Sequence, residues 1–408
     1  MSYPSTWTKV KFGEIAEIVN DRIDNPRESG LADYIGLEHL DTDEIRIKRY
    51  GSPEEVEATK FICKKGDIIF GKRRAYLRKL AVTERDAVVS AHSMVLRPKG
   101  EKILTRFLPL FMHSSIFWMT AQAISEGSLS PTIKWKTLKS QEFWIPSIPE
   151  QIKISEILWS LEENIEKIEN LIQITEKLKK ELLEVILTKG IDHNKFKKTE
   201  LGEIPEEWNI QLLGNIAEVN DGSHFSPIFD STGKHLIATV KDMKDDCFDT
   251  GSCKKISEEQ YSKLKKEGNI AKKGDVLFSK DGTIGQVFVY REDYEIALLS
   301  SIAIITPSEQ LLPDYLCEIF KSKIFYDQLE ILKSGTAIRR IVLKSLKKFM
   351  IPLPKNIGEQ KRILNIFKEI NSNIKKQKIH LLNIKNLKKK FTNSLLSGEL
   401  LIPKEVIT

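Results

Sequence analysis

Residues 150–190 begin EQIKISEILWSLEENIEKIENLI and end LTKG, and residues 359–398 begin EQKRILNIFKEINSNI and end LLSG. Apolar residues recur in both stretches at steps of three and four, which predicts one apolar stripe along a long helix. A helix of about forty residues is on the order of 60 Å long. Because the stretch occurs twice, we expect the two helices to pack on each other. The alternative is a single helix lying on a large domain without a partner rod.

The predicted stripes are formed by isoleucine, leucine and phenylalanine. The first contains Ile157, Leu161, Ile165, Ile168, Ile172, Leu178, Leu182 and Ile186. The second contains Ile363, Ile366, Ile370, Ile374, Leu381, Ile384, Leu387, Phe391 and Leu395. Single apolar seams flanked by Lys and Glu are typical of coiled-coil arms.

The composition excludes several classes of protein. The chain has 408 residues with 41% hydrophobic and 30% charged residues, enough to build two or three domains with sizeable cores. The apolar runs are too short for a membrane span, and the first residues lack the apolar core of a secretory signal, so we expect a cytoplasmic protein. A net charge of +7 allows a polyanionic partner only where the positive charge is gathered on chosen faces.

Motifs for metal binding and catalysis are missing from the sequence. The four cysteines form no CxxC pair, and the seven histidines form no cluster with metal-ligand spacing. Phosphate-binding glycine loops, the GxSxG elbow and HExxH are also absent. We therefore expect no catalytic residue and no metal site.

The two halves of the chain are copies of one design. WTKVKFGEIAEIVND at residues 7–21 corresponds to WNIQLLGNIAEVND at residues 208–221. KKGD followed by a short apolar run occurs at residues 64–67 and again at residues 272–275. Such a turn followed by an apolar run predicts the start of a strand. An isoleucine-proline phrase then leads into each long helix.

The copies differ most in one stretch of each half. Residues 22–59 and 222–264 have little in common, although the frame around them recurs. Two binding surfaces that recognise different things on one scaffold would look like this. Simple drift of loop sequence is the other explanation.

The repeat predicts an α+β fold with two similar mixed α/β domains and two long helices that form an antiparallel coiled coil. The expected parts are residues 1–148 (first domain), 149–190 (first helix), 191–206 (linker), 207–354 (second domain), 355–398 (second helix) and 399–408 (tail). The phrase LLSGELLIP suggests that the tail approaches the start of the first half. The arrangement would then be pseudo-two-fold and nearly circular.

Basic residues gather at matching places in the halves. The run after the first KKGD strand, GKRRAYLRK, contains Lys72, Arg73, Arg74 and Arg78, whereas its counterpart SKDGTIG contains only Lys280. IKWKTLK in the first half corresponds to IRRIVLK in the second. Arginine forks suit phosphates and guanine edges. Each run alone is more typical of a solvated face, and its recurrence favours nucleic acid.

The ordered frame resembles the specificity subunit of type I restriction-modification enzymes. It consists of Trp, then (F/L)G-x-IAE, KKGD and a strand, Gly-Ser or Gly-Thr, IP-x-(I/L)-P, and Glu-Gln opening a long helix, all present twice. The resemblance covers nearly the whole chain. The spacer after the proline phrase differs between the copies, which weakens the transfer of individual contacts.

The resemblance implies a non-catalytic reader of DNA. Each globular half would be a target recognition domain for one part of a split, asymmetric sequence in double-stranded DNA. The paired helices would set the spacer and dock two adenine methyltransferase (modification) subunits, which restriction subunits join. S-adenosylmethionine, ATP and Mg²⁺ would belong to those partners, and no cofactor would be bound by this chain.

Specific DNA contacts follow as a hypothesis. The first half would use Lys72, Arg73, Arg74, Arg78 and Lys134, and the second half would use Lys280, Thr283, Arg339 and Arg340. Small residues would permit a close approach to the DNA backbone at Gly127, Ser128, Gly335 and Thr336.

Two other functions remain open from the sequence. A self-contained DNA-modifying or DNA-cleaving enzyme would act on DNA as the purified chain. A coiled-coil adaptor would show no affinity for DNA even with methyltransferase subunits present.

Overall fold

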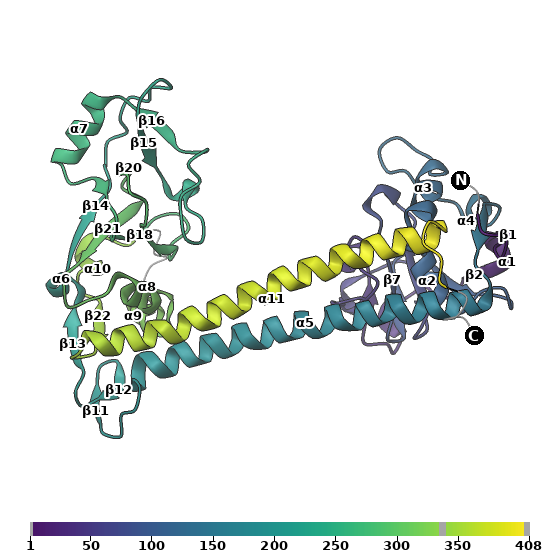
Figure 1. Cartoon of the computed structure of the whole chain (residues 1–408), viewed down its shortest axis with the longest axis horizontal. Helices are drawn as coiled ribbons and strands as arrows, with labels where there is room; N and C mark the ends of the chain where they lie inside the picture. The colour runs from purple at the N-terminus through teal and green to yellow at the C-terminus, as the bar shows by residue number, and fades with distance from the viewer. Residues whose placement is uncertain (1–2, 334–339, 404–408) are drawn as a thin grey trace. The chain divides into compact units, whose positions relative to one another are not determined.

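The computed structural model describes residues 3–333 and 340–403. The chain divides into two compact units, each of which contains part of both long helices (Figure 1). Unit 1 is Met1–Asn170 with Lys378–Thr408, and unit 2 is Leu171–Gln377.

Unit 1 contains two four-stranded sheets and a two-stranded ribbon. The first sheet has the order β2-β9-β6-β7 and is antiparallel throughout. The second has the order β3-β5-β8-β4, with only β4 parallel to its neighbour. The strands are β1 (Thr8–Lys11), β2 (Ala16–Val19), β3 (Arg22–Ile23), β4 (Tyr34–Ile35), β5 (Lys60–Cys63), β6 (Ile68–Gly71), β7 (Leu80–Val82), β8 (Ala87–Val89), β9 (Ser93–Pro98) and β10 (Glu142–Ile145), which pairs with β1.

Unit 2 repeats this plan. Its sheets have the orders β14-β21-β18-β19 and β16-β15-β20-β17, and β13 pairs with β22. The strands are β11 (Phe196–Thr199), β12 (Gly202–Pro205), β13 (Asn209–Leu212), β14 (Ala217–Asp221), β15 (His235–Ala238), β16 (Lys254–Ile256), β17 (Ile270–Ala271), β18 (Val276–Ser279), β19 (Val287–Val289), β20 (Ile296–Leu298), β21 (Ile302–Pro307) and β22 (Met350–Leu353). The hairpin β11-β12 lies in the segment expected as a linker.

Helices in both units are short, except for one long helix after each proline phrase. Those of the first half are α1 (Phe12–Ile15), α2 (Phe107–Met112), α3 (Ser115–Ala123), α4 (Trp135–Leu138) and α5 (Ile148–Lys189). Those of the second are α6 (Leu213–Ile216), α7 (Glu258–Lys266), α8 (Pro313–Lys321), α9 (Lys323–Lys333), α10 (Leu343–Leu346) and α11 (Ile357–Ser397). Single 3₁₀ turns are η1 (Pro26–Glu28), η2 (Leu37–His39), η3 (Pro53–Glu55), η4 (Ala75–Leu77) and η5 (Val240–Asp242). The predicted fold class, two mixed α/β parts with two long helices, is confirmed.

The KKGD turn places the central strand of the first sheet in each unit. Gly66 and Gly274 adopt φ values of 94° and 97°, a region that favours glycine. The following aspartate accepts a hydrogen bond from the backbone N–H three residues earlier, at 2.7 Å for Asp67 and 2.8 Å for Asp275. These bonds close the turn, and the apolar run that follows enters the sheet as buried β6 or β18.

The second sheets of the two units share three strands and differ in the fourth. The order β5-β8-β4 corresponds to β17-β20-β15, with one parallel pair in each. In unit 1 the fourth strand, β3, pairs with β5, whereas in unit 2 the fourth strand, β16, pairs with β15 at the opposite edge. Helix α7 packs on the unit 2 sheet through Tyr261 and Leu264 (Figure 1). These differences fall in the two stretches where the sequences diverge.

A fully buried glutamine fixes the start of each long helix. The Gln151 amide accepts a hydrogen bond from the Leu104 N–H at 2.9 Å and donates to the Lys102 carbonyl at 2.8 Å. Gln360 makes the same pair of bonds with Leu312 and Gln310, at 2.9 and 2.8 Å. In each unit the amide joins the first turn of the helix to the loop that follows the last strand of the first sheet.

The two helices run antiparallel within unit 1. Moving along α5, Leu158 packs in the core that contains Leu395, Glu162 pairs with Lys388, and Glu169 pairs with Lys385. The partners on α11 therefore come in descending order. The tail also approaches the start of the chain as predicted, since a Cβ added at Gly398 would lie 3.0 Å from Pro4 Cδ.

Unit 2 contains the other parts of the same helices, and they also pack together. Leu183 and Ile186 near the end of α5 share a core with Ile363 and Phe367 near the start of α11. Asp192, just after α5, pairs with Arg362 at 3.2 Å. The predicted antiparallel pairing is confirmed in each unit.

Three residues of the predicted stripes lie outside the seam. Ile157, Leu178 and Leu387 are exposed, whereas the other predicted positions are buried or half-buried. The seam of α5 follows a seven-residue repeat through Leu158, Ile165 and Ile172. Paired helices favour this repeat because it keeps one face toward the partner. On α11 the repeat places Lys388 in the seam, where it pairs with Glu162, instead of Leu387.

Gln360→Ala should lower the free energy of unfolding of unit 2 by about 2 kcal/mol, because the Leu312 N–H would stay buried without its acceptor. Urea titration of the full chain, followed by circular dichroism, measures the change. Lys361→Ala, at the exposed neighbouring position, should change it by less than about 0.5 kcal/mol. Equal effects of the two substitutions would contradict the anchoring role of Gln360.

Candidate nucleic-acid interface

In unit 1 the basic loop after β6 is joined to the segment before α4. The Ile133 N–H donates to the Lys72 carbonyl at 2.9 Å, and the Arg74 N–H donates to the Pro131 carbonyl at 2.7 Å. The two segments lie far apart in the sequence. The fold therefore brings Lys72, Arg73 and Arg74 beside Lys134, as the DNA-contact hypothesis requires.

Unit 2 joins the corresponding segments by the same contact. The Ile341 N–H donates to the Lys280 carbonyl at 2.8 Å, and Asp281 forms a β-bridge with Arg340. The loop after β18 and the segment before α10 thus lie side by side. Each unit presents one such pair of segments, which we call its paired loops: residues 71–74 with 131–134 in unit 1, and residues 279–285 with 340–341 in unit 2.

Two arginines in the paired loops of unit 1 form no ion pair with an acidic residue within the described part of the chain. Arg73 and Arg74 are exposed. The Arg73 guanidinium donates to His92 Nε2 at 3.3 Å, so that nitrogen carries no proton. Partial burial and the neighbouring charges of Arg73 and Lys72 lower the pKa of His92, and burial with the charge of Arg22 lowers the pKa of Lys72. An anion placed here would relieve this repulsion.

Two other predicted contacts of unit 1 already have acidic partners. Lys134, at the end of the paired loops, pairs with Glu126 at 2.6 Å on the surface. Arg78 pairs with Asp43 at 2.9 Å, and its side chain is mostly buried. Its guanidinium also lies over the ring of Trp118. These contacts give Arg78 a structural role, and its assignment as a DNA contact stays a prediction.

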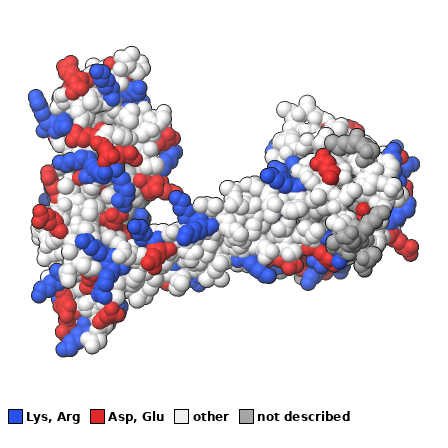
Figure 2. Space-filling view, in the orientation of Figure 1, with Lys and Arg blue, Asp and Glu red and all other residues white. Residues whose placement is uncertain are grey.

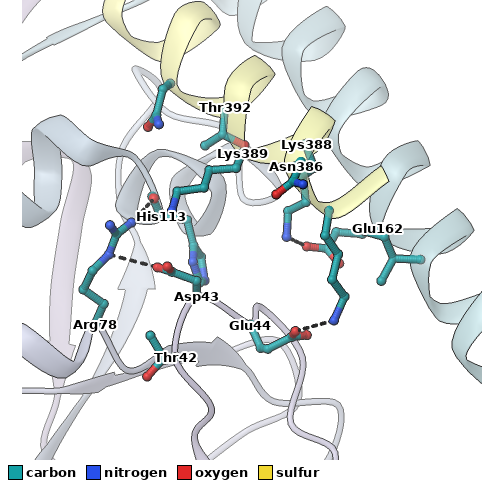
Figure 3. Close-up of a pocket in the computed structure, with 13 residues that line it drawn as sticks. Thr42, Asp43, Glu44, Arg78, His113, Glu162, Asn386, Lys388, Lys389 and Thr392 are labelled. Atoms are coloured by element: carbon teal, nitrogen blue, oxygen red, sulfur yellow. Dashed lines mark hydrogen bonds and ion pairs between the residues drawn. The ribbon is translucent and has the colours of Figure 1, made fainter. Parts of the chain in front are cut away.

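Arg78 belongs to a charged cavity between a loop of unit 1 and its helices (Figure 3). The cavity has a volume of about 180 Å³. Across it Glu44 pairs with Lys385 at 2.9 Å, and Glu162 pairs with Lys388. The first pair attaches the loop that follows η2 to α11, and the second joins α5 to α11.

The structure contradicts the predicted DNA contact of Lys280. Its side chain is fully buried, and its ammonium pairs with Asp221 Oδ1 at 3.0 Å. The other carboxylate oxygen, Oδ2, pairs with His224 at 3.0 Å. A buried ammonium with a carboxylate partner is not available to a polyanion. The role of Lys280 is to tie the paired loops of unit 2 to the start of the divergent stretch.

The remaining predicted contacts of unit 2 are exposed or lie outside the described residues. Thr283 and Arg340 are exposed, and the Thr283 carbonyl accepts a hydrogen bond from the Ser279 hydroxyl at 2.6 Å. Three predicted residues, Gly335, Thr336 and Arg339, lie outside residues 3–333 and 340–403. In unit 1 the corresponding Gly127 and Ser128 are exposed on a short hairpin closed by the bridge between Glu126 and Thr132.

The charge pattern of the sequence did not indicate several exposed apolar side chains. In unit 2 Phe225, Ile228 and Phe229 are exposed, and the Lys254 ammonium lies over the Phe229 ring at 3.9 Å. In unit 1 the missed residue is Leu129. Charge patterns do not indicate apolar contact residues. In the sequence these side chains are marked only by their position, in a divergent stretch for unit 2 and after a glycine for unit 1.

Charge is mixed on the face of unit 2 that the space-filling view shows. Figure 2 shows Lys and Arg interspersed with Asp and Glu on the visible face of unit 2. Within the described residues, His, Cys, Asp and Glu form no group that could hold a metal ion. No helix in the described part of the chain is long and apolar enough to cross a membrane.

Comparison with known proteins identifies related chains. The sequence model of the family described as type I restriction modification DNA specificity domain matches residues 4–180 and again residues 205–384. The putative type I restriction enzyme MjaX specificity subunit of Methanocaldococcus jannaschii is 26% identical over 415 residues, which cover 97% of this chain and 94% of that protein.

Solved structures share the fold. A chain from a study of complex assembly and conformational transition of the type I R-M system has a TM-score of 0.64 at 20% identity, with coverage of 98% of this chain and 100% of that chain. The HsdS subunit from Thermoanaerobacter tengcongensis has a TM-score of 0.51 at 20% identity, with coverage of 98% and 99%. Both likenesses extend over both repeats.

Asp221→Ala should lower the free energy of unfolding of unit 2 by about 3 kcal/mol, because it leaves the Lys280 ammonium buried without a partner. Denaturant titration of the full chain measures the loss. The double variant Asp221→Ala with Lys280→Met should recover most of it, since the buried charge is then gone. Additive losses in the double variant would refute this assignment.

Proposed function

The chain belongs to the family of type I restriction modification DNA specificity domains, and we propose that it reads a bipartite, asymmetric DNA target through its two units. It is the non-catalytic specificity subunit of such a system. Double-stranded DNA and the other subunits of the system are its partners.

The recurrence of the paired loops is the observation that carries this proposal. Both units place the loop after the central strand beside the segment before a short helix, through the same backbone hydrogen bond. What surrounds the paired loops differs, because β3 and β16 extend opposite edges of the second sheet. The two units therefore hold the paired loops in the same way but surround them with different residues, which suits recognition of two half-sites of different sequence.

The charge of the paired loops suits contact with DNA phosphates and guanine edges. Arg73 and Arg74 in unit 1 and Arg340 in unit 2 are exposed and have room for a ligand. Lys72, Lys134 and Thr283 lie beside them and complete the proposed contacts. Arginine in such loops either positions the backbone or reads guanine through a bidentate pair.

The finer assignment of partners is also part of the proposal. Two modification subunits dock on the long helices, restriction subunits join them, and S-adenosylmethionine, ATP and Mg²⁺ are bound by those partners. Support comes from an exposed apolar stripe on α5 within unit 2, spaced at three, four and seven residues: Leu171, Ile174, Leu178 and Val185. A stripe of this spacing suits a partner helix.

Methylation of a random-sequence DNA pool tests the function. The chain is mixed with a cognate modification subunit, and each component is also assayed alone. Methyl marks on one bipartite sequence only in the mixture would support the proposed role and would give the target and spacer. Modification or cleavage by the chain alone would overturn it, and so would marks on the same sequence by the modification subunit alone.

Arg74→Ala and Arg340→Ala should each weaken recognition of one half-site only. A base contact would cost roughly 1 to 3 kcal/mol and relax one base position, whereas a phosphate contact would lower the salt slope of binding by about one. Binding of the complex to half-site variants over a range of salt concentrations measures both. Lys9→Ala and Arg291→Ala, which remove surface charges paired with Glu142 and Asp314, serve as controls.

Unchanged affinity and salt slope for both arginine variants would reject these contacts. If Arg74→Ala weakened binding to both half-sites equally, Arg74 would still contribute charge to DNA binding. The proposal that each unit recognises one half-site would be rejected.

Ile174→Asp should weaken association with the modification subunit at least about tenfold, because a charge would be buried in the apolar contact. Analytical ultracentrifugation of the mixture measures the affinity. Gln173→Asp adds the same charge at the adjacent exposed position and should have a much smaller effect. Equal association of both variants would show that this stripe does not bind the partner.

A further inference from the structure

Leu129 occupies an unusual place in unit 1. It is 93% exposed, the most exposed of the large apolar side chains in the described residues. A single exposed leucine is ordinary on a protein surface. Leu129, however, lies at the tip of the hairpin that the bridge between Glu126 and Thr132 closes, with serine on both sides. The tip is therefore narrow and carries one large apolar group.

The base of this hairpin is braced. Glu126 and Thr132 exchange two backbone hydrogen bonds, at 3.0 and 2.9 Å. The Thr132 hydroxyl donates to the Ser130 carbonyl at 3.1 Å, and Lys134 pairs with Glu126 at 2.6 Å. A braced hairpin holds its tip in one place without the help of Leu129. The Leu129 side chain is therefore not needed for the fold of the hairpin and can contact a ligand.

The hairpin is also attached directly to the basic loop. The Arg74 N–H bonds to the Pro131 carbonyl, and Arg73 forms a β-bridge with Thr132. Any polyanion held by the paired loops of unit 1 would lie next to the tip. A leucine among arginines cannot bind phosphate. The apolar surfaces that a DNA duplex offers near its phosphates are the thymine methyl groups and the faces of its bases, and a narrow tip with one large side chain suits insertion between base faces.

We propose that Leu129 is an apolar wedge that enters the base stack of the first half-site while the arginines of the paired loops hold the phosphates. The proposal rests on the proposed function and deepens it, since it assigns a DNA-deforming residue to unit 1. A protein that inserts leucine between two base pairs must unstack them. The free energy of unstacking is lower at flexible base steps, so such a protein binds those steps more tightly. Leu129 thereby contributes to specificity through the deformability of the sequence.

The experiment uses the full chain with its modification subunit and the duplex that the methylation pool identifies. 2-Aminopurine replaces single bases across the first half-site, because its fluorescence rises when it unstacks. Wild-type complex should raise the fluorescence at one step other than the adenine that the modification subunit flips out for methylation. Leu129→Ala should abolish that rise and weaken binding roughly tenfold, the effect expected for losing a buried leucine side chain. Leu129→Met should retain most of both.

Leu401→Ser is the matched control, since it removes an exposed leucine elsewhere in unit 1 and should change neither reading. Wild-type binding without a rise at any base other than the methylated adenine would overturn the wedge. Loss of affinity when thymine is replaced by uracil would then assign Leu129 to a methyl group in the groove. Weaker association with the modification subunit in Leu129→Ala would instead indicate a protein contact. Absence of a specific target in the wild-type complex would refute the proposed function itself.

Discussion

The buried amides of Gln151 and Gln360 are the constraint on which each unit depends. Each amide satisfies a backbone N–H and a backbone carbonyl in a loop next to the first sheet, out of reach of water. A polar group in that position is costly unless both of its bonds form. The first turn of each long helix is therefore held in one orientation against the domain that precedes it.

The two units use this common frame for different surfaces. In unit 1 the loop after β6 leaves Arg73 and Arg74 exposed, and burial with nearby charge lowers the pKa of Lys72. In unit 2 the corresponding lysine, Lys280, is buried against Asp221 and serves the fold. The scaffold fixes where a loop lies, and the side chains decide whether it faces a ligand. An asymmetric target is the expected consequence.

The helix seam also differs between the units in its chemistry. In unit 1 it includes Glu162 paired with Lys388, next to a charged cavity with Arg78 and Asp43. In unit 2 it is apolar, with Leu183 and Ile186 against Phe367. Polar residues in a helical seam cost stability and favour one register over its neighbours. The charged part of the seam therefore favours one register of the two helices, and the apolar part stabilises their pairing.

The repeat, the two long helices, the mixed sheets and the family could be predicted from the residues alone, because periodicity and motif order are local properties of the chain. The sequence also contains the basic runs that the fold brings together before α4 and α10. Other features became visible only in the folded chain. Lys280 pairs with Asp221 and Arg78 pairs with Asp43. Lys388 lies in the seam in place of Leu387, and Leu129 is exposed. The physical reason is that burial and ion pairing depend on neighbours distant in sequence, which residue type and spacing do not encode.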